Sequence, residues 1–215
     1  QKVSSFMDSA HLTPDLVLRG YLSGIFPMAD PEEDDAIYWY APDPRGILPL
    51  DQFHVSKNLR KLIRQQKFEV TTDRAFGAVV RACAAPRASD AKTWISEEVI
   101  AVYEALHRYG FAHSVECWSE GELAGGLYGV HLGAAFFGES MFSRRRDGSK
   151  IALAHLVARL RAGGFTLLDT QFTTPHLESM GARAVPRTHY HDLLARALAR
   201  RADFYSLGDD SATAE

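Results

Sequence analysis

The sequence predicts an α+β fold, with a small N-terminal α/β domain (residues 1–50) joined to a larger domain (residues 51–215) that has a mixed, largely antiparallel sheet. Three observations support this class. The chain has 215 residues, of which 46% are hydrophobic and 24% charged, a composition typical of globular proteins of one large domain or a domain with a smaller annex. Residues 111–140 contain three strand-like segments separated by short turns, which favours antiparallel pairing. Segments with helical periodicity precede and follow these strands.

The small domain is predicted to begin with a helix. Thr13 suits its N-cap and Pro14 its first position. Irregular chain should follow this helix, then an exposed acidic loop at residues 30–35 and an aromatic strand at residues 37–40. The buried side of the helix is predicted to consist of Leu16, Leu18, Tyr21, Leu22 and Ile25.

The larger domain alternates strands and helices from residue 68 onward. Predicted strands cover 68–72, 111–118, 122–130, 134–140, 165–172 and 182–185, and predicted helices cover 73–84, 96–109, 149–162, 175–180 and 189–200. This order resembles the GNAT acyltransferase fold, in which strands four and five splay apart to hold an acyl donor. Because one fold hosts many functions, the order alone assigns none.

Positive charge is concentrated in the middle of the chain. Residues 53–202 hold 21 Lys and Arg against 14 Asp and Glu, whereas residues 1–52 hold 3 against 9. A helix predicted at residues 55–66 contains four cations at i, i+3, i+4 and i+7, and no acid interrupts residues 53–68. Such a stripe suits a phosphate backbone, although an ordinary solvated face has the same pattern. The four cations are Lys57, Arg60, Lys61 and Arg64.

A second basic segment leaves a predicted strand at Gly138 and enters a predicted helix at Ser149. Arg144, Arg145 and Lys150 lie beside the helix start, where exposed N–H groups bind phosphate. GNAT acetyltransferases bind coenzyme A here through Q/R-x-x-G-x-G/A, and Lys150 in place of the last small residue departs from that pattern. The segment also lacks the final Gly of the G-x-S-x-G nucleophile elbow, which argues against a serine hydrolase.

Three polar side chains follow or interrupt buried strands. Glu139 ends one predicted strand, while Asp169 and Gln171 lie on another, and their spacing of two points both to the same side of the sheet. A carboxylate that follows an apolar run, as Asp169 does, is either a paired structural group or a tuned acid or base.

Several classes of protein are excluded. The histidines and the two cysteines, Cys83 and Cys117, lack zinc-ligand spacing, so no metal is expected. No apolar run approaches the ~18 residues that span a bilayer, and no secretory signal opens the sequence. We therefore expect a soluble cytoplasmic protein that makes no contact with a membrane.

Eight short motifs occur in order along residues 20–195. They are Gly24-Ile25-Phe26-Pro27, Trp39-Tyr40-Ala41-Pro42-Asp43-Pro44-Arg45, Phe53-His54-Val55-Ser56, Thr93-Trp94-Ile95, His113-Ser114-Val115-Glu116, Gly125-Gly126-Leu127-Tyr128-Gly129-Val130, Gly138-Glu139-Ser140-Met141-Phe142-Ser143 and His176-Leu177-Glu178-Ser179-Met180-Gly181-Ala182. Together they resemble the leucyl/phenylalanyl-tRNA–protein transferase family. Two positions depart from its motifs: Tyr40 replaces a second Trp, and Thr170 replaces the Cys of Asp-Cys-Gln.

The resemblance implies an aminoacyltransferase that moves Leu or Phe from Leu-tRNA or Phe-tRNA to the N-terminal α-amine of proteins starting with Lys or Arg. The product would enter N-end rule degradation. The implied fold is a small N-terminal domain joined to a GNAT-like domain, and the enzyme is expected to be a monomer without cofactors. The alternatives are a GNAT N-acetyltransferase that uses acetyl-coenzyme A, and a non-catalytic tRNA-binding protein.

The resemblance also implies roles for the polar side chains. Asp169 and Gln171 would face an apolar cavity and handle the acceptor amine, with Asp169 as orienter or base in a relay through Gln171. Glu139 would bind near the α-amino group of the donor. A ribose hydroxyl that shuttles the proton would leave Asp169 a purely electrostatic role, and the sequence does not separate these mechanisms.

The remaining contacts concern the aminoacyl-tRNA. The donor side chain is expected to bind a pocket formed by Met141, Leu127, Phe136 and Leu156. The terminal adenine is expected to stack on Trp39 and Trp94. The tRNA backbone is expected to contact Lys57, Arg60, Lys61, Arg64, Arg144, Arg145 and Lys150.

Overall fold

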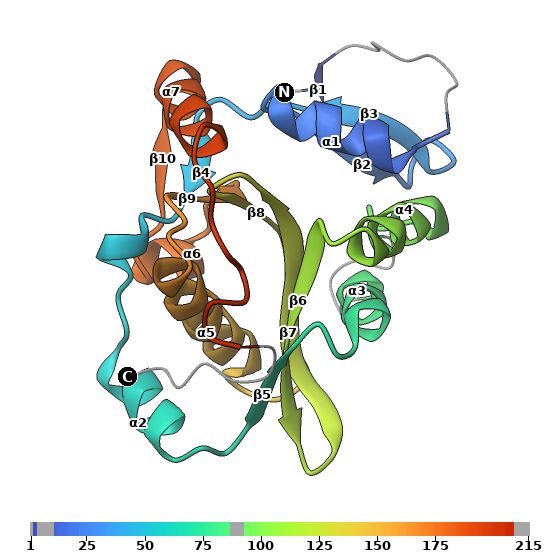
Figure 1. Cartoon of the computed structure of the whole chain (residues 1–215). Coiled ribbons are helices and arrows are strands. Elements are labelled where there is room, and N and C mark those ends of the chain that lie inside the picture. Colours follow the sequence, from blue (N-terminus) through green and yellow to red (C-terminus); the bar gives the residue numbers. More distant parts are fainter. Residues whose placement is uncertain (1, 4–10, 87–92, 209–215) are drawn as a thin grey trace.

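The computed structural model describes residues 2–3, 11–86 and 93–208. Its strands form a three-stranded sheet of order β1-β3-β2 and a seven-stranded sheet of order β10-β4-β9-β8-β7-β6-β5 (Figure 1). Every pairing is antiparallel except that of β8 with β9. The predicted class, α+β with a mixed and largely antiparallel sheet, is therefore confirmed.

The three-stranded sheet and one helix form the N-terminal unit. Its elements are α1 (Pro14–Leu22), β1 (Lys2–Val3), β2 (Phe26–Asp30) and β3 (Ala36–Tyr40). The Thr13 side chain caps α1, as predicted, by accepting a hydrogen bond from the N–H of Leu16 at 3.2 Å. The predicted buried side of α1 is partly wrong, because Val17 is buried while Leu22 is 51% exposed.

Strand β2 was not expected, because the segment after the first helix was predicted to be irregular chain. In the structure β2 is an edge strand that pairs only with β3 in the three-stranded sheet. An edge strand tolerates proline, since the missing N–H faces away from the partner strand. The aromatic strand predicted at residues 37–40 corresponds to β3, its partner.

The large sheet contains the remaining strands. They are β4 (Arg45–Ile47), β5 (Glu69–Thr72), β6 (Ala112–Ser119), β7 (Glu122–Leu132), β8 (Ala135–Ser143), β9 (Leu167–Gln171) and β10 (Arg183–Val185). Strand β4 was not expected. It inserts between β9 and β10, so the first 50 residues supply a strand to the large sheet.

Helices cover both faces of this sheet (Figure 1). They are α2 (Lys57–Arg64), α3 (Phe76–Ala84), α4 (Glu97–Arg108), α5 (Gly148–Ala162), α6 (Pro175–Ser179) and α7 (Arg187–Leu198), with a short 3₁₀ helix at Leu50–Gln52. Helices α3 and α4 pack on one face and α5 on the other. Buried side chains form one apolar core on each face. No helix in the described ranges is long and apolar enough to cross a membrane.

Strands β8 and β9 run side by side only at their first residues. Pairing links residues 135–137 to residues 167–169 and then stops. Beyond that point β8 remains with β7, while β9 pairs with β4. This separation of two parallel strands is the splay expected of a GNAT-like order, and it opens the sheet where the site lies.

Candidate active site

A cavity of about 820 Å³ lies where β8 and β9 separate. This volume falls within the usual range of small-molecule sites. Its polar lining includes Tyr128, Glu139, Thr170 and His176. Its apolar lining includes Leu127, Met141, Leu153, Leu156, Leu168 and Leu177 from β7, β8, β9, α5 and α6, and Ala82 from α3.

A β-bulge places Glu139 in this cavity. In the register of β7 with β8, Tyr128 lies opposite Ser140 and Gly129 lies opposite Gly138. Glu139 is therefore the extra residue of β8, with no residue of β7 opposite it. Bulges redirect a side chain out of the regular alternation. This one turns Glu139 toward Tyr21 of α1, whose hydroxyl is also hydrogen-bonded to that of Tyr103 of α4.

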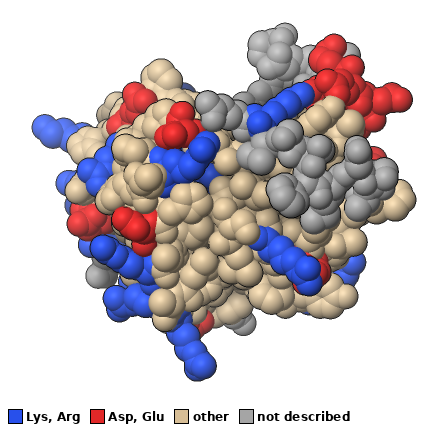
Figure 2. All heavy atoms as spheres, turned by 90° about the horizontal axis from the view of Figure 1, so that it is seen from above, with Lys and Arg blue, Asp and Glu red and all other residues tan. Residues whose placement is uncertain are grey.

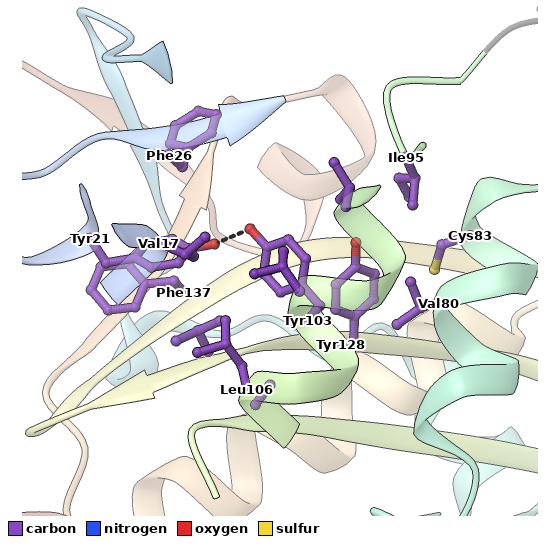
Figure 3. Packing of buried hydrophobic residues seen from close by; sticks show 14 of the residues in the cluster. Val17, Tyr21, Phe26, Val80, Cys83, Ile95, Tyr103, Leu106, Tyr128 and Phe137 are labelled. Atoms are coloured by element: carbon purple, nitrogen blue, oxygen red, sulfur yellow. Dashed lines mark hydrogen bonds between the residues drawn. The ribbon is translucent and has the colours of Figure 1, made fainter. Parts of the chain in front are cut away.

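The two oxygens of Glu139 have different environments. Oε1 accepts hydrogen bonds from the hydroxyl of Tyr21 and from Nε2 of Gln171, the latter at 3.1 Å. The Tyr21 hydroxyl also lies 2.6 Å from that of Tyr103 (Figure 3). Oε2 is buried and has no hydrogen-bond partner in the part of the chain that the structure describes. Burial raises the pKa of Glu139 to about 8, although these hydrogen bonds act in the opposite direction.

Asp169 lies at the centre of a buried network behind the cavity wall. Arg45 donates to it twice, from Nε to Oδ1 at 3.1 Å and from Nη2 to Oδ2 at 2.7 Å. The hydroxyl of Tyr190 donates to Oδ2 at 2.6 Å. The Arg45 guanidinium also lies 4.9 Å from the ring centre of Phe26 and 4.3 Å from that of Tyr190. Two-point pairing of this kind fixes both the position and the orientation of the carboxylate.

Gln171 links this network to Glu139. Its backbone has φ 66°, in the left-handed region that favours glycine. The side chain of Asp169 supports that conformation by accepting a hydrogen bond from the N–H of Gln171 at 2.7 Å, as in an Asx turn. The continuous chain of contacts is therefore Arg45–Asp169–Gln171–Glu139, and the Asp-x-Gln spacing provides its central step.

The structure brings the three predicted catalytic residues together but places only Glu139 on the cavity wall. Strand β9 contributes Leu168 and Thr170 to the lining described, while Asp169 and Gln171 point to the opposite side of the strand. The expectation that Asp169 and Gln171 face the cavity directly is thus corrected. Their same-sided arrangement holds, and they reach the cavity through Glu139.

Three of the four predicted pocket residues, Leu127, Met141 and Leu156, line the cavity. Phe136 is not among the lining residues. It lies in the paired part of β8, opposite Leu168, and its ring stacks on Phe204 with ring centres 5.9 Å apart. The strands have not yet separated at this position, so the side chain is enclosed by the core.

The two predicted adenine platforms lie outside the described lining of this cavity. Trp39 is only 8% exposed, and its ring packs on Gly20 of α1, where a Cβ would lie 2.2 Å from the ring. Trp94 is half-buried and packs against the core under α3 and α4. Neither ring therefore presents an open face at the cavity.

The predicted tRNA-binding residues form two groups. Lys57, Arg60, Lys61 and Arg64 are all exposed on α2, and none makes an ion pair with another described residue. Helix α2 is capped by Ser56 and packs through the buried Leu59. The four cations therefore remain available to a polyanion.

The second basic group is more engaged with the protein. Arg144 lines the cavity, Arg145 lies 3.7 Å from Glu120, and Lys150 lies 3.5 Å from Asp147. The first turn of α5 is also partly occupied, because Ser143 Oγ accepts from the N–H of Ser149 at 2.8 Å. This helix start is consequently a less open phosphate site than the sequence predicted.

Sequence reasoning missed the residues that hold this network. Arg45 and Tyr190 support Asp169, and Tyr21 supports Glu139. Arg45 ends one of the motifs described above, but nothing in the sequence connects it to a residue 124 positions away. Within the described residues, no group of three or more His, Cys, Asp and Glu side chains is arranged to hold a metal ion.

Comparisons with known proteins agree with this architecture. The family model of the leucyl/phenylalanyl-tRNA protein transferase matches residues 47–195, and the model of its N-terminal domain matches residues 10–43. These matches assign the chain to the transferase enzymes. It belongs to the leucyl/phenylalanyl-tRNA–protein transferase family.

Curated relatives bear the same name. The chain is 58% identical to the leucyl/phenylalanyl-tRNA–protein transferase of Maricaulis maris over 90% of each chain. It is 55% identical to that of Salinibacter ruber, over 94% of this chain and 87% of the relative. It is 56% identical to that of Paramagnetospirillum magneticum, over 90% of this chain and 92% of the relative.

Proposed function

We propose that this protein transfers Leu or Phe from Leu-tRNA or Phe-tRNA to the N-terminal α-amine of proteins that begin with Lys or Arg. It does so in the cytoplasm, as a monomer, and marks its products for N-end rule degradation. The observation that carries the proposal is the Glu139 carboxylate, which lines a largely apolar cavity and has one oxygen without a hydrogen-bond partner among the described residues. Family membership supplies the class of donor and acceptor.

The chemistry requires no cofactor or metal, because an aminoacyl ester is already activated. The acceptor amine attacks the ester carbonyl carbon, the ribose oxygen leaves, and one proton passes from the nitrogen to that oxygen. The enzyme must orient the two reactants and stabilise the charge that develops on the carbonyl oxygen.

Glu139 and the apolar wall bind the donor. The α-amino group of the aminoacyl ester is placed at Oε2 of Glu139, where its positive charge would favour the ionised carboxylate and lower its raised pKa. The Leu or Phe side chain is placed against Met141, Leu127 and Leu156. An apolar pocket distinguishes side chains by only about 1–3 kcal/mol per methylene, so some transfer of Met is expected.

Gln171 and Asp169 support the acceptor reaction through Glu139. The Gln171 amide donates to Glu139 through Nε2 and so fixes the position of the carboxylate beside the reacting groups. Asp169 acts through Gln171 as a positioning residue, because its two oxygens are occupied by Arg45, Tyr190 and the Gln171 N–H. Proton transfer through a ribose hydroxyl is compatible with this arrangement.

The exposed stripe on α2 contacts the tRNA. Lys57, Arg60, Lys61 and Arg64 repeat with helical spacing along a single helix, and such a stripe can follow a phosphate backbone without reading sequence. This role assigns a partner to four cations that make no ion pair with any residue in the described ranges.

A transfer assay tests the proposed function. Radiolabelled Leu-tRNA is incubated with peptides that begin with Arg, Lys or Asp, in the presence of EDTA and without ATP. We expect label on the Arg and Lys peptides and little on the Asp peptide. Absence of label from Leu-tRNA and Phe-tRNA, with acetylation of the same peptides from acetyl-coenzyme A, would contradict the proposal.

A further inference from the structure

Tyr128 carries a buried hydroxyl group in the candidate site. Tyr128 lies on β7, is fully buried, and lines the same cavity as Glu139. Among the described residues its hydroxyl makes no hydrogen bond. Its ring makes edge contacts with Tyr103 (Figure 3), at a ring-centre distance of 5.6 Å, and with Phe76, at 5.8 Å.

Packing alone does not account for this hydroxyl. A buried donor without a partner costs about 1–3 kcal/mol, and phenylalanine would fill the same space between the two rings without that cost. The neighbouring buried tyrosines differ, because Tyr21 and Tyr103 are bonded to one another and Tyr190 donates to Asp169. Of these four buried tyrosines, Tyr128 is the one whose hydroxyl has no hydrogen-bond partner among the described residues.

Tyr128 and Glu139 offer complementary groups to one ligand. Tyr128 lies at the bulge that carries Glu139, opposite Ser140 in the register of β7 with β8. The phenol is a donor, and burial together with the nearby Glu139 raises its pKa well above the ordinary value, so it keeps its proton. Oε2 of Glu139 has no hydrogen-bond partner among the described residues, and it becomes an acceptor when the carboxyl group is ionised. An aminoacyl ester carries both counterparts, a carbonyl oxygen that accepts and an amino group that donates.

We propose that Tyr128 is a further catalytic residue, which donates a hydrogen bond to the carbonyl oxygen of the bound aminoacyl ester and stabilises the oxyanion of the tetrahedral intermediate. This inference rests on the proposed function. When the acceptor nitrogen bonds to the carbonyl carbon, the π electrons of the C=O bond move to the oxygen that Tyr128 contacts. When the intermediate collapses, those electrons re-form the C=O bond and the bond between the carbonyl carbon and the ribose oxygen breaks. The proton lost by the nitrogen is transferred to the ribose oxygen. Tyr128 keeps its own proton throughout.

The substitution Tyr128→Phe removes only the donor. Loss of one oxyanion donor reduces kcat by about 100- to 1000-fold in well-studied enzymes. We expect kcat for Leu transfer to an Arg-starting peptide to fall to this extent, with the KM values for Leu-tRNA and for the peptide within about twofold of the parent. Tyr109→Phe removes a phenol from an exposed position and should leave kcat unchanged.

A binding measurement separates a catalytic role from a structural one. A phosphonate analogue of the tetrahedral intermediate, linked to adenosine, should bind Tyr128→Phe about 100-fold more weakly than the parent. An aminoacyl-adenosine amide, which carries no oxyanion, should lose much less affinity. Equal loss for both compounds would overturn the inference.

The two proposals fail in different ways. If the parent protein transfers no amino acid, the proposed function fails. If the parent is active and Tyr128→Phe keeps its kcat, the proposed function stands and the role of Tyr128 is refuted. If the variant unfolds at the assay temperature, by circular dichroism, the hydroxyl has a structural role and the inference is likewise refuted.

Discussion

At the residue scale, the charge of Asp169 is balanced within the protein. Arg45, Tyr190 and the Gln171 N–H together supply four hydrogen bonds to a carboxylate that water does not reach. Removing the ion pair of Arg45 and Asp169 from water costs much free energy. Such a buried pair is tolerated only when its geometry is good and all its hydrogen bonds are formed. Removal of one partner should therefore cost much more than the pair itself contributes.

Arg45→Leu is predicted to lower the free energy of unfolding by about 3–5 kcal/mol, because it leaves a buried carboxylate uncompensated. The double variant Arg45→Leu/Asp169→Leu should regain part of this loss. Urea denaturation followed by circular dichroism measures both. The control is Arg19→Ala, which breaks the Arg19–Asp15 pair whose side chains are both 74% exposed, and it should change stability by less than about 1 kcal/mol. Equal effects at the two sites would show that the buried pair has no special role.

At the element scale, the sequence pattern of helix α2 determines which of its side chains are buried and which form a basic surface. The Ser56 cap, the buried Leu59 and the stripe of cations all lie within residues 56–64. Seen from above, Figure 2 shows Lys and Arg spread over the surface, while Asp and Glu are densest at one corner and also lie among the cations on the opposite side. A binding role for α2 therefore has to be tested against other exposed cations.

The double variant Arg60→Ala/Arg64→Ala is predicted to weaken Leu-tRNA binding and to reduce its salt dependence. Two fewer phosphate contacts should lower the slope of log Kd against log salt by about 1–2. Fluorescence anisotropy between 50 and 300 mM NaCl measures the slope. The matched control is Arg108→Ala, an exposed cation near the end of α4. A slope equal to that of the parent would exclude α2 as the RNA contact.

Elements with local signals were predictable from the sequence. Side-chain caps at Thr13 and Ser96 mark the starts of α1 and α4, and the short turns of the β6-β7-β8 meander gave its antiparallel order. Strand β4 was missed because its three residues follow a proline-rich turn and pair only with distant strands. The bulge at Glu139 was missed because it exists only in the register of β7 with β8. The side chains of β9 that face the cavity were also not predictable, because they depend on where β8 and β9 separate.

At the scale of the whole molecule, two buried carboxylates make stability depend on pH. Burial raises the pKa of Glu139 to about 8 and that of Glu116, on β6, to about 7. Glu116 accepts from the N–H of Ala75 at 2.6 Å, but its second oxygen has no partner among the described residues. Both folded-state values exceed the ordinary 4.5, so the protonated forms are favoured in the native state. The stability linked to each group is therefore complete below about pH 4.5 and is lost as pH rises through 7 and 8.

Glu139→Gln is predicted to become more stable than the parent as pH rises from 5 to 8.5, by about 2–4 kcal/mol. The free energy of unfolding of Glu116→Gln should rise by about 1–3 kcal/mol relative to that of the parent, and this difference should stop growing near pH 7. Urea denaturation at half-unit steps of pH measures each variant as a difference from the parent, which cancels the titration of the histidines. Parallel curves for parent and Glu139→Gln would show that Glu139 is ionised in the native state throughout.

The threading of β4 between β9 and β10 has a consequence for synthesis of the chain. Arg45 emerges from the ribosome 124 residues before Asp169, which at about 5–20 residues per second is a delay of roughly 6–25 s. During that interval Arg45 cannot pair with Asp169, and β4 cannot pair with β9 or β10. A newly made copy can therefore complete this buried ion pair only after strand β9 has been synthesised.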